Sequence, residues 1–469
     1  MTTNTQTSTS PSSKVNISHA QMRQRYNLST ALALIIGVCV GSGIFFKSDN
    51  ILVATHGNVV LGAAMFILGC ASVIFGGLTL SVFAERYRGA GGMYGYAHAY
   101  LKPSFARFIG WHYTFLYLPF MVAIISWVFG VYACMIFGLE SSLTNEILIG
   151  TIYMLCCIAW NIFTPTMSGY FQNATTIIKA MPLIAVGILG FFFAENTPQI
   201  LSTHAASAPA QGLGWVMAAA PVAFALDGWT TALTIQPELK NAEKNLPIAM
   251  VLGPLIILAL YLAYFIGLTC TLGPETVMEV GDASLALLFV NLFGEHAAVL
   301  PNVLALIAIA GAANGYTMSL LRMPMALALN DEIFAAKKIS TVNAKLEFPL
   351  NSAIVAALCC FLAMALHFGV QYFELLPNGD FSEIGVAVTT LLLPVFYFRV
   401  FGMWRKGEIG IFRGLISPVL ASITTIILGL SGLSDPTRWP FITIYVAAFV
   451  LALIVTKRHP AHHNEMIVE

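Results

Sequence analysis

Charged residues are scarce in this sequence. Only 9% of its 469 residues are Asp, Glu, Lys or Arg and 58% are hydrophobic, whereas soluble domains average about 25% charged residues. This composition excludes a soluble globular domain and predicts an all-α polytopic membrane protein surrounded by the lipid bilayer. The formal net charge is zero, so charge gives no reason to expect a nucleic-acid partner.

The sequence also lacks the residue patterns of metal centres and enzyme active sites. Its eight cysteines lie in or at the ends of apolar segments, with no ligand-like spacing to histidines or carboxylates. We interpret them as small buried hydrophobic residues rather than as disulfide partners or metal ligands. The apolar segments contain no plausible nucleophile–base pair, which argues against a membrane-embedded enzyme. We therefore expect no metal, no cofactor and no enzymatic activity.

Apolar segments of spanning length follow one another along the chain. Most approach the ~20 residues that an α-helix needs to cross the hydrocarbon core. The polar residues 1–27 are predicted to form a disordered N-terminal tail, and residues 457–469 a C-terminal tail. The twelve segments have the approximate bounds 28–55, 59–83, 105–137, 146–163, 173–194, 213–236, 248–272, 297–322, 350–368, 383–401, 410–431 and 439–456.

The lysines and arginines divide unequally between the two sides of the membrane that these segments define. With a cytoplasmic N-terminus, all 22 lie on the cytoplasmic side except Lys47 and Arg438, which lie outside, and Lys179, which lies within a span. This is the positive-inside pattern. It predicts a multi-pass protein of the cell membrane whose N- and C-termini are both cytoplasmic.

Two of the spans contain residues that interrupt a helix. The first has Gly-Ser-Gly at residues 41–43, where glycine adds backbone freedom and serine offers competing hydrogen bonds. The sixth has Asp227-Gly228, and Asp227 is expected either to cap a half-helix that restarts at Trp229 or to contact a substrate. Because unpaired backbone groups are too costly to face lipid, such breaks persist where they line a cavity and bind a ligand.

The two breaks lie five spans apart, which is the signature of an inverted repeat. In a single transporter domain over residues 28–456, residues 28–194 would form the first repeat and residues 213–401 the second, followed by helices 11 and 12 in residues 410–456. The predicted fold is thus twelve helices with a 5+5 inverted repeat, broken in helices 1 and 6 around a substrate at the midplane. A small-residue packing face is the competing interpretation of residues 41–43, and the second break favours a binding site.

Several motifs resemble the amino acid–polyamine–organocation (APC) transporters. Residues 41–45, Gly-Ser-Gly-Ile-Phe, resemble the signature of their first helix, and residues 236–247 resemble the acidic cytoplasmic loop after their sixth. Asn314-Gly315 followed by Arg322 resembles their eighth helix. Residues 224–229, Phe-Ala-Leu-Asp-Gly-Trp, are similar to the L-type amino acid transporter branch in its bacterial serine/threonine-exchanger form.

The resemblance covers residues 28–456 and implies a LeuT-like fold that carries amino acids by exchange. The loop after the sixth helix departs from the family at Pro237-Glu238, where two acidic residues are usual, and at Ala242, where proline is usual. Eukaryotic members of the branch bond a glycoprotein through a cysteine between helices three and four. Residues 138–146 contain no cysteine, so no disulfide-linked heavy subunit is expected.

The expected pocket must hold the carboxylate and the ammonium of an α-amino acid. The exposed N–H groups of Ser42 and Gly43, at the N-terminus of a half-helix, would form an anion site, while unwound carbonyls would accept from the ammonium. The resemblance assigns these acceptors to Cys39, Phe224 and Asp227. It also makes Phe224 the outer gate, for which ordinary helix packing is the alternative. The predicted substrate-binding residues are Cys39, Gly41, Ser42, Gly43, Phe224, Asp227 and Gly228.

Two ionisable side chains, Lys179 and Asp227, lie well inside predicted spans, where such residues are functional candidates by default. Lys179 would lie ~15 Å along its helix at 1.5 Å per residue, and a lysine that snorkels to the cytoplasm is the alternative. By resemblance, its ammonium replaces a bound sodium ion and holds the broken first helix. His112 is interpreted as a polar residue at the membrane interface, with titration near neutral pH as the alternative.

The predicted spans place no other carboxylate deep enough to receive a guanidinium or a second ammonium group. This absence and the resemblance together predict a sodium-independent secondary transporter of neutral L-amino acids that works by exchange. The alternatives are a proton-coupled amino acid symporter and a cationic amino acid or polyamine antiporter of the same fold.

The predicted orientation places the segment from Glu195 to Gly212 outside the cell. A cysteine introduced at Ala206 should therefore react with an impermeant thiol reagent in intact cells, with the unsubstituted chain as the control for its native cysteines. Labelling that appears only after permeabilisation would show the opposite topology.

Overall fold

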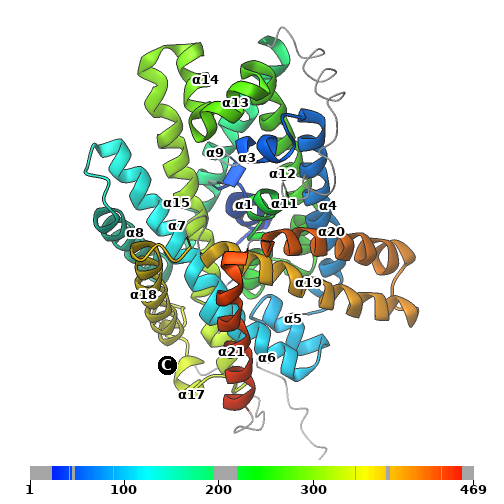
Figure 1. The fold of residues 1–469 in the computed structure, drawn as a ribbon. Helices are drawn as coiled ribbons and strands as arrows, with labels where there is room; N and C mark the ends of the chain where they lie inside the picture. The colour runs from blue at the N-terminus through cyan, green and yellow to red at the C-terminus, as the bar shows by residue number, and fades with distance from the viewer. Residues whose placement is uncertain are drawn as a thin grey trace, which may run out of the picture.

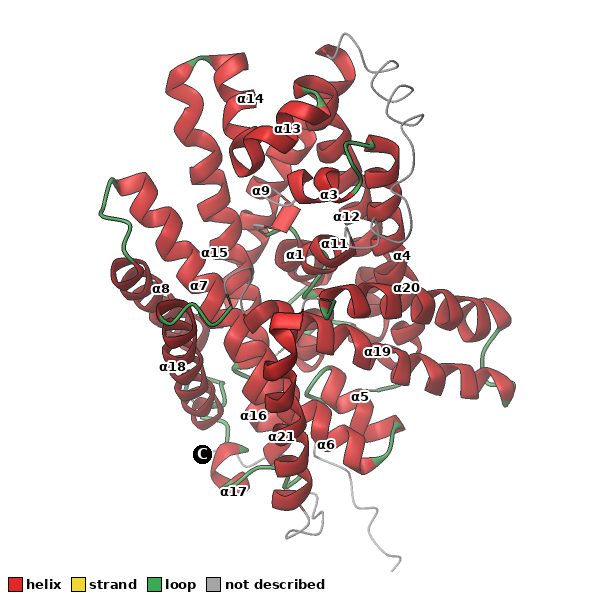
Figure 2. Cartoon of the chain, in the orientation of Figure 1, coloured by secondary structure: helices red, strands yellow, loops and turns green. Residues whose placement is uncertain are grey.

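The computed structural model describes residues 24–41, 43–44, 48–87, 89–193, 219–343, 345–376, 381–434 and 436–456. Every regular element in these ranges is a helix (Figures 1 and 2). Nine described helices are long and apolar enough to cross a membrane, and a tenth span results if α13 and α14, bent by 115°, count as one. The prediction of an all-helical membrane protein is therefore confirmed, whereas the count of twelve spans, the repeat boundaries and the inverted symmetry remain predictions.

The first predicted span is interrupted at the expected place. Helix α1 (Leu28–Cys39) ends where Val40 leaves the helical region at φ −75° and ψ 74°, and the chain is again helical in α3 (Ser48–Ala54). Ser42 lies outside the described residues, as do Lys47, the outer segment 195–212 and most of the two tails.

The sixth predicted span is interrupted as well. Helix α11 (Ala219–Ala225) is followed by Gly228 at φ +89°, a conformation that glycine adopts without strain, and then by the 3₁₀-helix η3 (Trp229–Glu238). The N-cap residue of η3 is Gly228, which makes no side-chain cap hydrogen bond. The predicted cap by Asp227 is therefore wrong, because its carboxylate accepts hydrogen bonds from two tyrosines instead.

The remaining helices surround the two broken ones. Helix α12 packs against α1, α4 and α9, while α15 packs against α7 and α9 (Figure 1). Glycines allow close approach: a Cβ at Gly187 of α9 would lie 2.8 Å from Ala263 Cβ of α12. The bounds are α4 Val59–Ala84, α5 Met93–Tyr100, α6 Pro103–Trp111, η1 His112–Tyr117, α7 Leu118–Phe137, α8 Leu143–Phe163, α9 Pro165–Phe193, α12 Ala242–Leu272, α13 Pro274–Val280, η4 Gly281–Ala283, α14 Ser284–Phe293, η5 Glu295–Val299, α15 Leu300–Leu320, α16 Met323–Ala328, α17 Ala336–Ile339, α18 Leu350–Tyr372, α19 Phe381–Arg405, η6 Phe412–Ile416, α20 Ser417–Gly432, η7 Pro436–Arg438 and α21 Trp439–Thr456.

A buried ionic cluster joins the start of α1 to the end of η3. The Glu238 carboxylate pairs with Arg25 at 3.0 Å and with Arg322, and all three side chains are at most 6% exposed. Tyr26 donates to the Pro165 carbonyl at 3.0 Å, and burial raises the pKa of its hydroxyl to about 12. Because removing one partner of a buried ion pair leaves an uncompensated charge, this cluster holds both broken spans at the end of the bundle that carries most of the basic residues.

Candidate functional site

The two breaks lie against each other. A Cβ added at Gly43 would lie 3.0 Å from the Ala225 Cα and 3.4 Å from a ring carbon of Phe224. The Cys39 thiol donates to the Leu226 carbonyl at 3.4 Å. Helix ends that come from opposite halves of the chain therefore meet in the interior, where four of the predicted substrate-binding residues, Cys39, Gly41, Gly43 and Gly228, are buried.

Tyr261 of α12 connects the two interrupted helix ends. Its hydroxyl lies 2.8 Å from the Cys39 carbonyl and 2.5 Å from the Ala225 carbonyl, both of which belong to the last residue of a helix. A carbonyl at the C-terminus of a helix has no partner within its own helix. The Tyr261 hydroxyl supplies a hydrogen-bond donor at both of these helix ends. The Cys39 carbonyl, predicted to receive the substrate ammonium, also accepts from the Gly41 N–H at 2.8 Å, so it already has the two hydrogen bonds that a carbonyl oxygen usually accepts.

Lys179 of α9 lies between α1 and α15. Its side chain is fully buried, and its ammonium donates to the Gly37 carbonyl and, at 3.3 Å, to the Ala308 carbonyl. Gly37 belongs to the last turn of α1, where the helix dipole favours a positive charge. The snorkelling interpretation is therefore wrong, because the ammonium binds carbonyls in the interior rather than reaching the membrane surface.

Two further side chains of α9 attach α1 in the same way. Gln172 and Thr176 both donate to the Ala33 carbonyl, at 3.3 and 3.0 Å. Gln172 is in turn held by Asn314 of α15, whose amide nitrogen donates to the Gln172 side-chain oxygen at 2.9 Å. Sequence reasoning singled out Asn314 for its resemblance alone and missed the two α9 residues. Polar residues three and seven positions before Lys179 lie on its face of the helix, and that spacing could have indicated them.

Asp227 lies at the second break and is half-buried. One of its carboxylate oxygens accepts hydrogen bonds from the Tyr117 and Tyr316 hydroxyls, each at 2.6 Å. Tyr117 ends η1 and Tyr316 lies in α15, so the carboxylate joins three segments of the bundle. Sequence reasoning offered no partner for Asp227, because the two tyrosines are distant along the chain and nothing in their local sequence points to a common acceptor.

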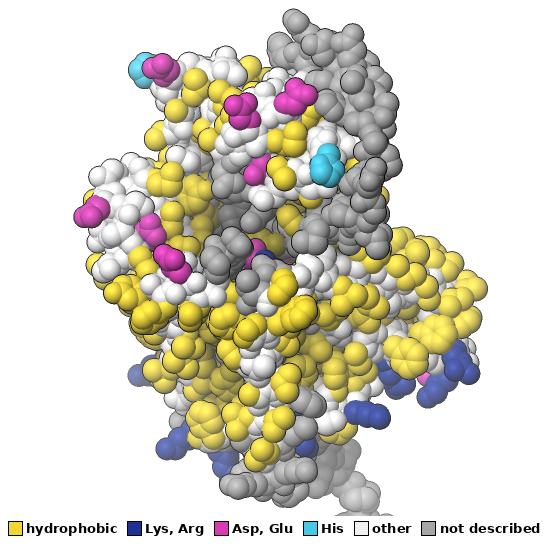
Figure 3. All heavy atoms as spheres, in the orientation of Figure 1, with side chains coloured by type: hydrophobic (Ala, Val, Ile, Leu, Met, Phe, Trp, Pro, Cys, Tyr) yellow, Lys and Arg dark blue, Asp and Glu magenta, His cyan; other side chains and the backbone are white. Residues whose placement is uncertain are grey.

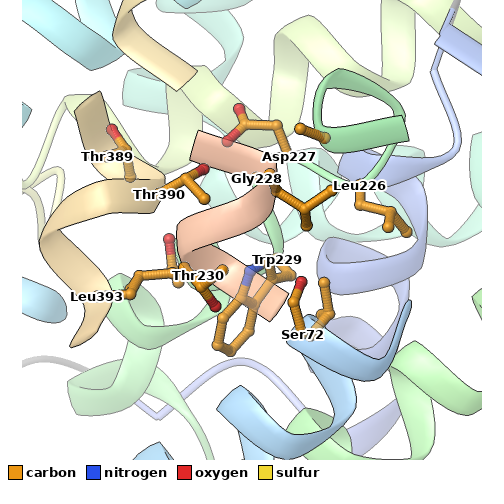
Figure 4. Close-up of a pocket in the computed structure, with 13 residues that line it drawn as sticks. Ser72, Leu226, Asp227, Gly228, Trp229, Thr230, Thr389, Thr390 and Leu393 are labelled. Carbon is orange, nitrogen blue, oxygen red and sulfur yellow. The ribbon is translucent and has the colours of Figure 1, made fainter. Parts of the chain in front are cut away.

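A small inner cavity of about 20 Å³, which is room for about one water molecule, adjoins this break. Asp227 and Gly228 line it on one side, and the hydroxyl-bearing Thr230, Thr389 and Thr390 lie around it (Figure 4). Further lining residues come from α4 and α20, among them Ser72 and Thr425. A space lined by several hydroxyls and one carboxylate suits a small polar ligand better than a long apolar one.

His112 supports the wall of this cavity. Its Nε2 lies 2.8 Å from the Thr389 hydroxyl, and its ring stacks on Tyr117 at 5.8 Å between centroids. The side chain is fully buried in η1. The interpretation of His112 as an interfacial residue is therefore wrong, because the ring faces the bundle interior.

A second cavity of about 170 Å³, called the outer cavity below, shares two lining residues with the inner one. Ala223 and Leu428 line both cavities, whereas Phe224 lines only the outer one. The outer cavity is also lined by Glu383, which forms an ion pair with Arg438. A ring carbon of Phe224 also lies near the first break at Gly43.

The described residues contain no group of three or more His, Cys, Asp or Glu side chains able to hold a metal ion. The described cysteines form no disulfide with one another, and six of the eight are buried.

Comparison with known proteins identifies relatives among transporters. A family model described as "Amino acid permease" matches residues 26–467. The serine/threonine exchanger SteT of Bacillus subtilis is 28% identical over 82% of this chain and 85% of its own length. The b(0,+)-type amino acid transporter 1 of the mouse is 25% identical over 53% of each chain, so that alignment spans about half of the relative. The human cystine/glutamate transporter is 22% identical over 89% of this chain and 82% of its own length.

The contact between the breaks predicts different effects for two neighbouring glycines. Gly43→Ala should lower the thermal stability of the purified protein by about 1–3 kcal/mol, because its Cβ would press on backbone atoms of α11. Gly41→Ala is the matched control, since its Cβ would lie 3.6 Å from Ala312 in ordinary contact. The measurement is thermal unfolding of both variants in detergent. Equal midpoints for the two would mean that the breaks do not meet as described.

Proposed function

The chain belongs to the amino acid permease family and is an amino acid transporter, and from this premise we propose that it exchanges neutral L-amino acids across the cell membrane without sodium coupling. Alternating access would occur around the breaks in helices 1 and 6. This function needs no enzymatic step, and its relatives are named as exchangers and transporters.

The observation that carries the proposal is the contact between the two breaks in the interior. Interrupted helices persist in a membrane where their free backbone groups bind a ligand. The N–H groups around residues 41–43 would receive the substrate carboxylate, and carbonyls at Cys39 and Phe224, with Asp227, would receive its ammonium. Gly41, Ser42, Gly43 and Gly228 complete the proposed site, and Phe224 would be its outer gate.

Lys179 supports sodium independence. Its ammonium is already held by the Gly37 and Ala308 carbonyls, and backbone carbonyls are the ligands that coordinate sodium at broken helices. A second cation at these carbonyls would meet the repulsion of the first. We therefore propose that Lys179 replaces a sodium ion and keeps the inner half of helix 1 attached to α9.

Neutral substrates are favoured by the charges of the inner cavity. Asp227 is the one carboxylate among its lining residues, and two tyrosine hydroxyls already bind it. With Asp227 receiving the α-ammonium of the substrate, a guanidinium or a second ammonium would find no further carboxylate there. Similarity to a protein named as a serine/threonine exchanger, together with the threonine-lined wall, supports small neutral amino acids and an exchange mode.

The orientation follows from the distribution of charge. On the face shown in Figure 3, Asp and Glu gather towards the upper end and Lys and Arg towards the lower end. By the positive-inside rule the lower end would be cytoplasmic. With this orientation both termini are inside, and the outer cavity with Phe224, Glu383 and Arg438 opens to the outside.

Counterflow tests the exchange mode. Proteoliposomes loaded with unlabelled serine should take up radiolabelled serine or threonine many times faster than empty ones, and a pH gradient should not replace the internal substrate. Arginine and putrescine inside should not stimulate uptake. Uptake into empty liposomes driven by a proton gradient would instead establish the symporter, and stimulation by arginine or putrescine would establish the cationic antiporter.

The role of Lys179 is tested by substitution. Exchange by the wild type should be equal in sodium and choline buffers. Lys179→Ala should lower exchange about ten- to a hundredfold, because losing a charge-assisted hydrogen bond costs ~1.5–3 kcal/mol. Lys337→Ala, at an exposed lysine, is the control and should retain wild-type exchange. Size-exclusion chromatography verifies that each variant is folded. Folded Lys179→Ala with normal exchange, or strong stimulation of the wild type by sodium, would contradict the assignment.

A further inference from the structure

An apolar groove lies between α19 and α20, and it shares no lining residue with the inner or the outer cavity. It has an empty volume of about 1030 Å³ and is lined mainly by apolar side chains, among them Pro394, Phe398, Phe401 and Val419. Phe398 is 74% exposed and Val419 43% exposed. Aromatic and aliphatic side chains are thus presented to the membrane beside a concave surface rather than on a flat one.

Two prolines explain why the helices leave this space. Pro394 lies inside α19, where proline removes one intrahelical hydrogen bond and bends the helix. Pro418 is the second residue of α20, directly after the π-helix η6, where proline again cannot donate a backbone hydrogen bond. The groove therefore begins at a built irregularity of α19 and follows the helix towards its C-terminal end.

The groove leads to a basic end. Pro394, Phe398, Phe401 and Arg405 are spaced at i, i+4, i+7 and i+11, so they lie on one face of α19. The eleven-residue step from Pro394 to Arg405 corresponds to about 16 Å along the helix at 1.5 Å per residue. This length is close to half of the ~30 Å hydrocarbon core and matches one acyl chain of a single leaflet.

The basic end carries an excess of positive charge. Arg405 and Lys406 are exposed, and neither makes an ion pair or a hydrogen bond among the described residues. Arg399 lies one turn before Met403 on α19, and its buried Nε has no hydrogen-bond partner. Together these three cations offer unused donors next to the end of the groove.

The acidic residues nearby are already paired. Arg86 binds Glu408 at 3.3 Å, and Arg413 binds Glu85 at 2.8 Å. Five cations, namely Arg86, Arg399, Arg405, Lys406 and Arg413, therefore face two carboxylates, which leaves an excess of three positive charges. Figure 3 shows Lys and Arg side chains below the apolar surface, in the region where Figure 1 draws the end of the α19–α20 pair.

We propose that this groove is a binding site for an anionic phospholipid, with one acyl chain along Phe398 and Val419 and the phosphate at Arg399, Arg405 and Lys406. Basic pockets at the ends of membrane helices attract anionic headgroups, and Arg binds phosphate through paired hydrogen bonds. A second copy of the chain is a poorer occupant, because two copies in the same membrane orientation would bring like charges together.

The test uses the purified, delipidated full chain. Native mass spectrometry and thermal unfolding are measured with dioleoyl phosphatidylglycerol and, separately, with dioleoyl phosphatidylcholine. The wild type should bind phosphatidylglycerol about tenfold more tightly or better and unfold at a higher temperature with it. Equal binding of the two lipids would overturn the proposal.

Three variants separate the groove from general charge effects. Arg405→Gln/Lys406→Gln should lose most of the preference for phosphatidylglycerol. Lys337→Gln/Lys338→Gln also removes two exposed cations, at another loop, and should retain it. Val419→Trp fills the groove without changing charge and should weaken binding of phosphatidylglycerol.

Each variant also has a result that counts against the site. Retained preference in Arg405→Gln/Lys406→Gln, or its loss in Lys337→Gln/Lys338→Gln, would overturn the headgroup assignment. Saturation by soluble glycerol 3-phosphate with the same affinity would show a phosphate site without a lipid. A dimer in solution that Val419→Trp dissolves would assign the groove to a second copy of this chain. Because binding is measured without transport, a negative result here leaves the proposed exchange untouched.

Discussion

The structure depends on how it satisfies backbone carbonyls where two membrane helices stop in the interior. In hydrocarbon each such group would cost several kcal/mol without a partner. Two side chains from neighbouring helices bind these carbonyls: Lys179 binds the Gly37 carbonyl, and Tyr261 binds those of Cys39 and Ala225. One turn earlier in α1, Gln172 binds the Ala33 carbonyl. The two breaks are therefore stabilised by side chains of α9 and α12.

This arrangement attaches the two halves of helix 1 unequally. Its inner half is held along α9 and, through Arg25 and Tyr26, at the buried carboxylate of Glu238. Its outer continuation, α3, packs mainly with α11 and α13 near the outer cavity. A transporter that rocks around a central site needs one part to stay fixed while another moves. Breaking the buried polar contacts of α1 would cost free energy, so we expect its inner half to be the part that stays fixed.

The polar groups around the inner cavity form one connected arrangement. Asp227 binds Tyr117 and Tyr316, His112 stacks on Tyr117, and the same histidine holds the Thr389 hydroxyl. A displacement of Asp227 at the second break would therefore affect the positions of side chains on η1, α15 and α19 together. Shared hydrogen bonds of this kind hold the wall of the inner cavity in one arrangement, although the His112 Nδ1 makes no hydrogen bond among the described residues.

Much of the molecule is predictable from local sequence. Low charge content and long apolar runs determine that the chain is a helical membrane protein, because only helices and closed barrels satisfy their backbone in lipid. Gly-Ser-Gly at residues 41–43 and Asp227-Gly228 determine where two helices break, since these residues destabilise a helix wherever it packs. The depth of Lys179 follows from counting residues along a helix.

Contacts between distant segments were decided only by the tertiary structure. Asp227 does not cap η3, because two tyrosines more than eighty residues away bind its carboxylate. His112 is buried rather than interfacial, because Thr389 and Tyr117 lie beside it. The helices α13 and α14 lie between the predicted spans 248–272 and 297–322, where the sequence predicts no element. The hydrophobicity of a residue reflects its own transfer from water, and a helix breaker acts through its own backbone. Both effects can therefore be predicted directly from the sequence. The hydrogen-bond partners of a buried side chain depend on which helices lie next to its own helix. This arrangement is established only when the whole bundle packs.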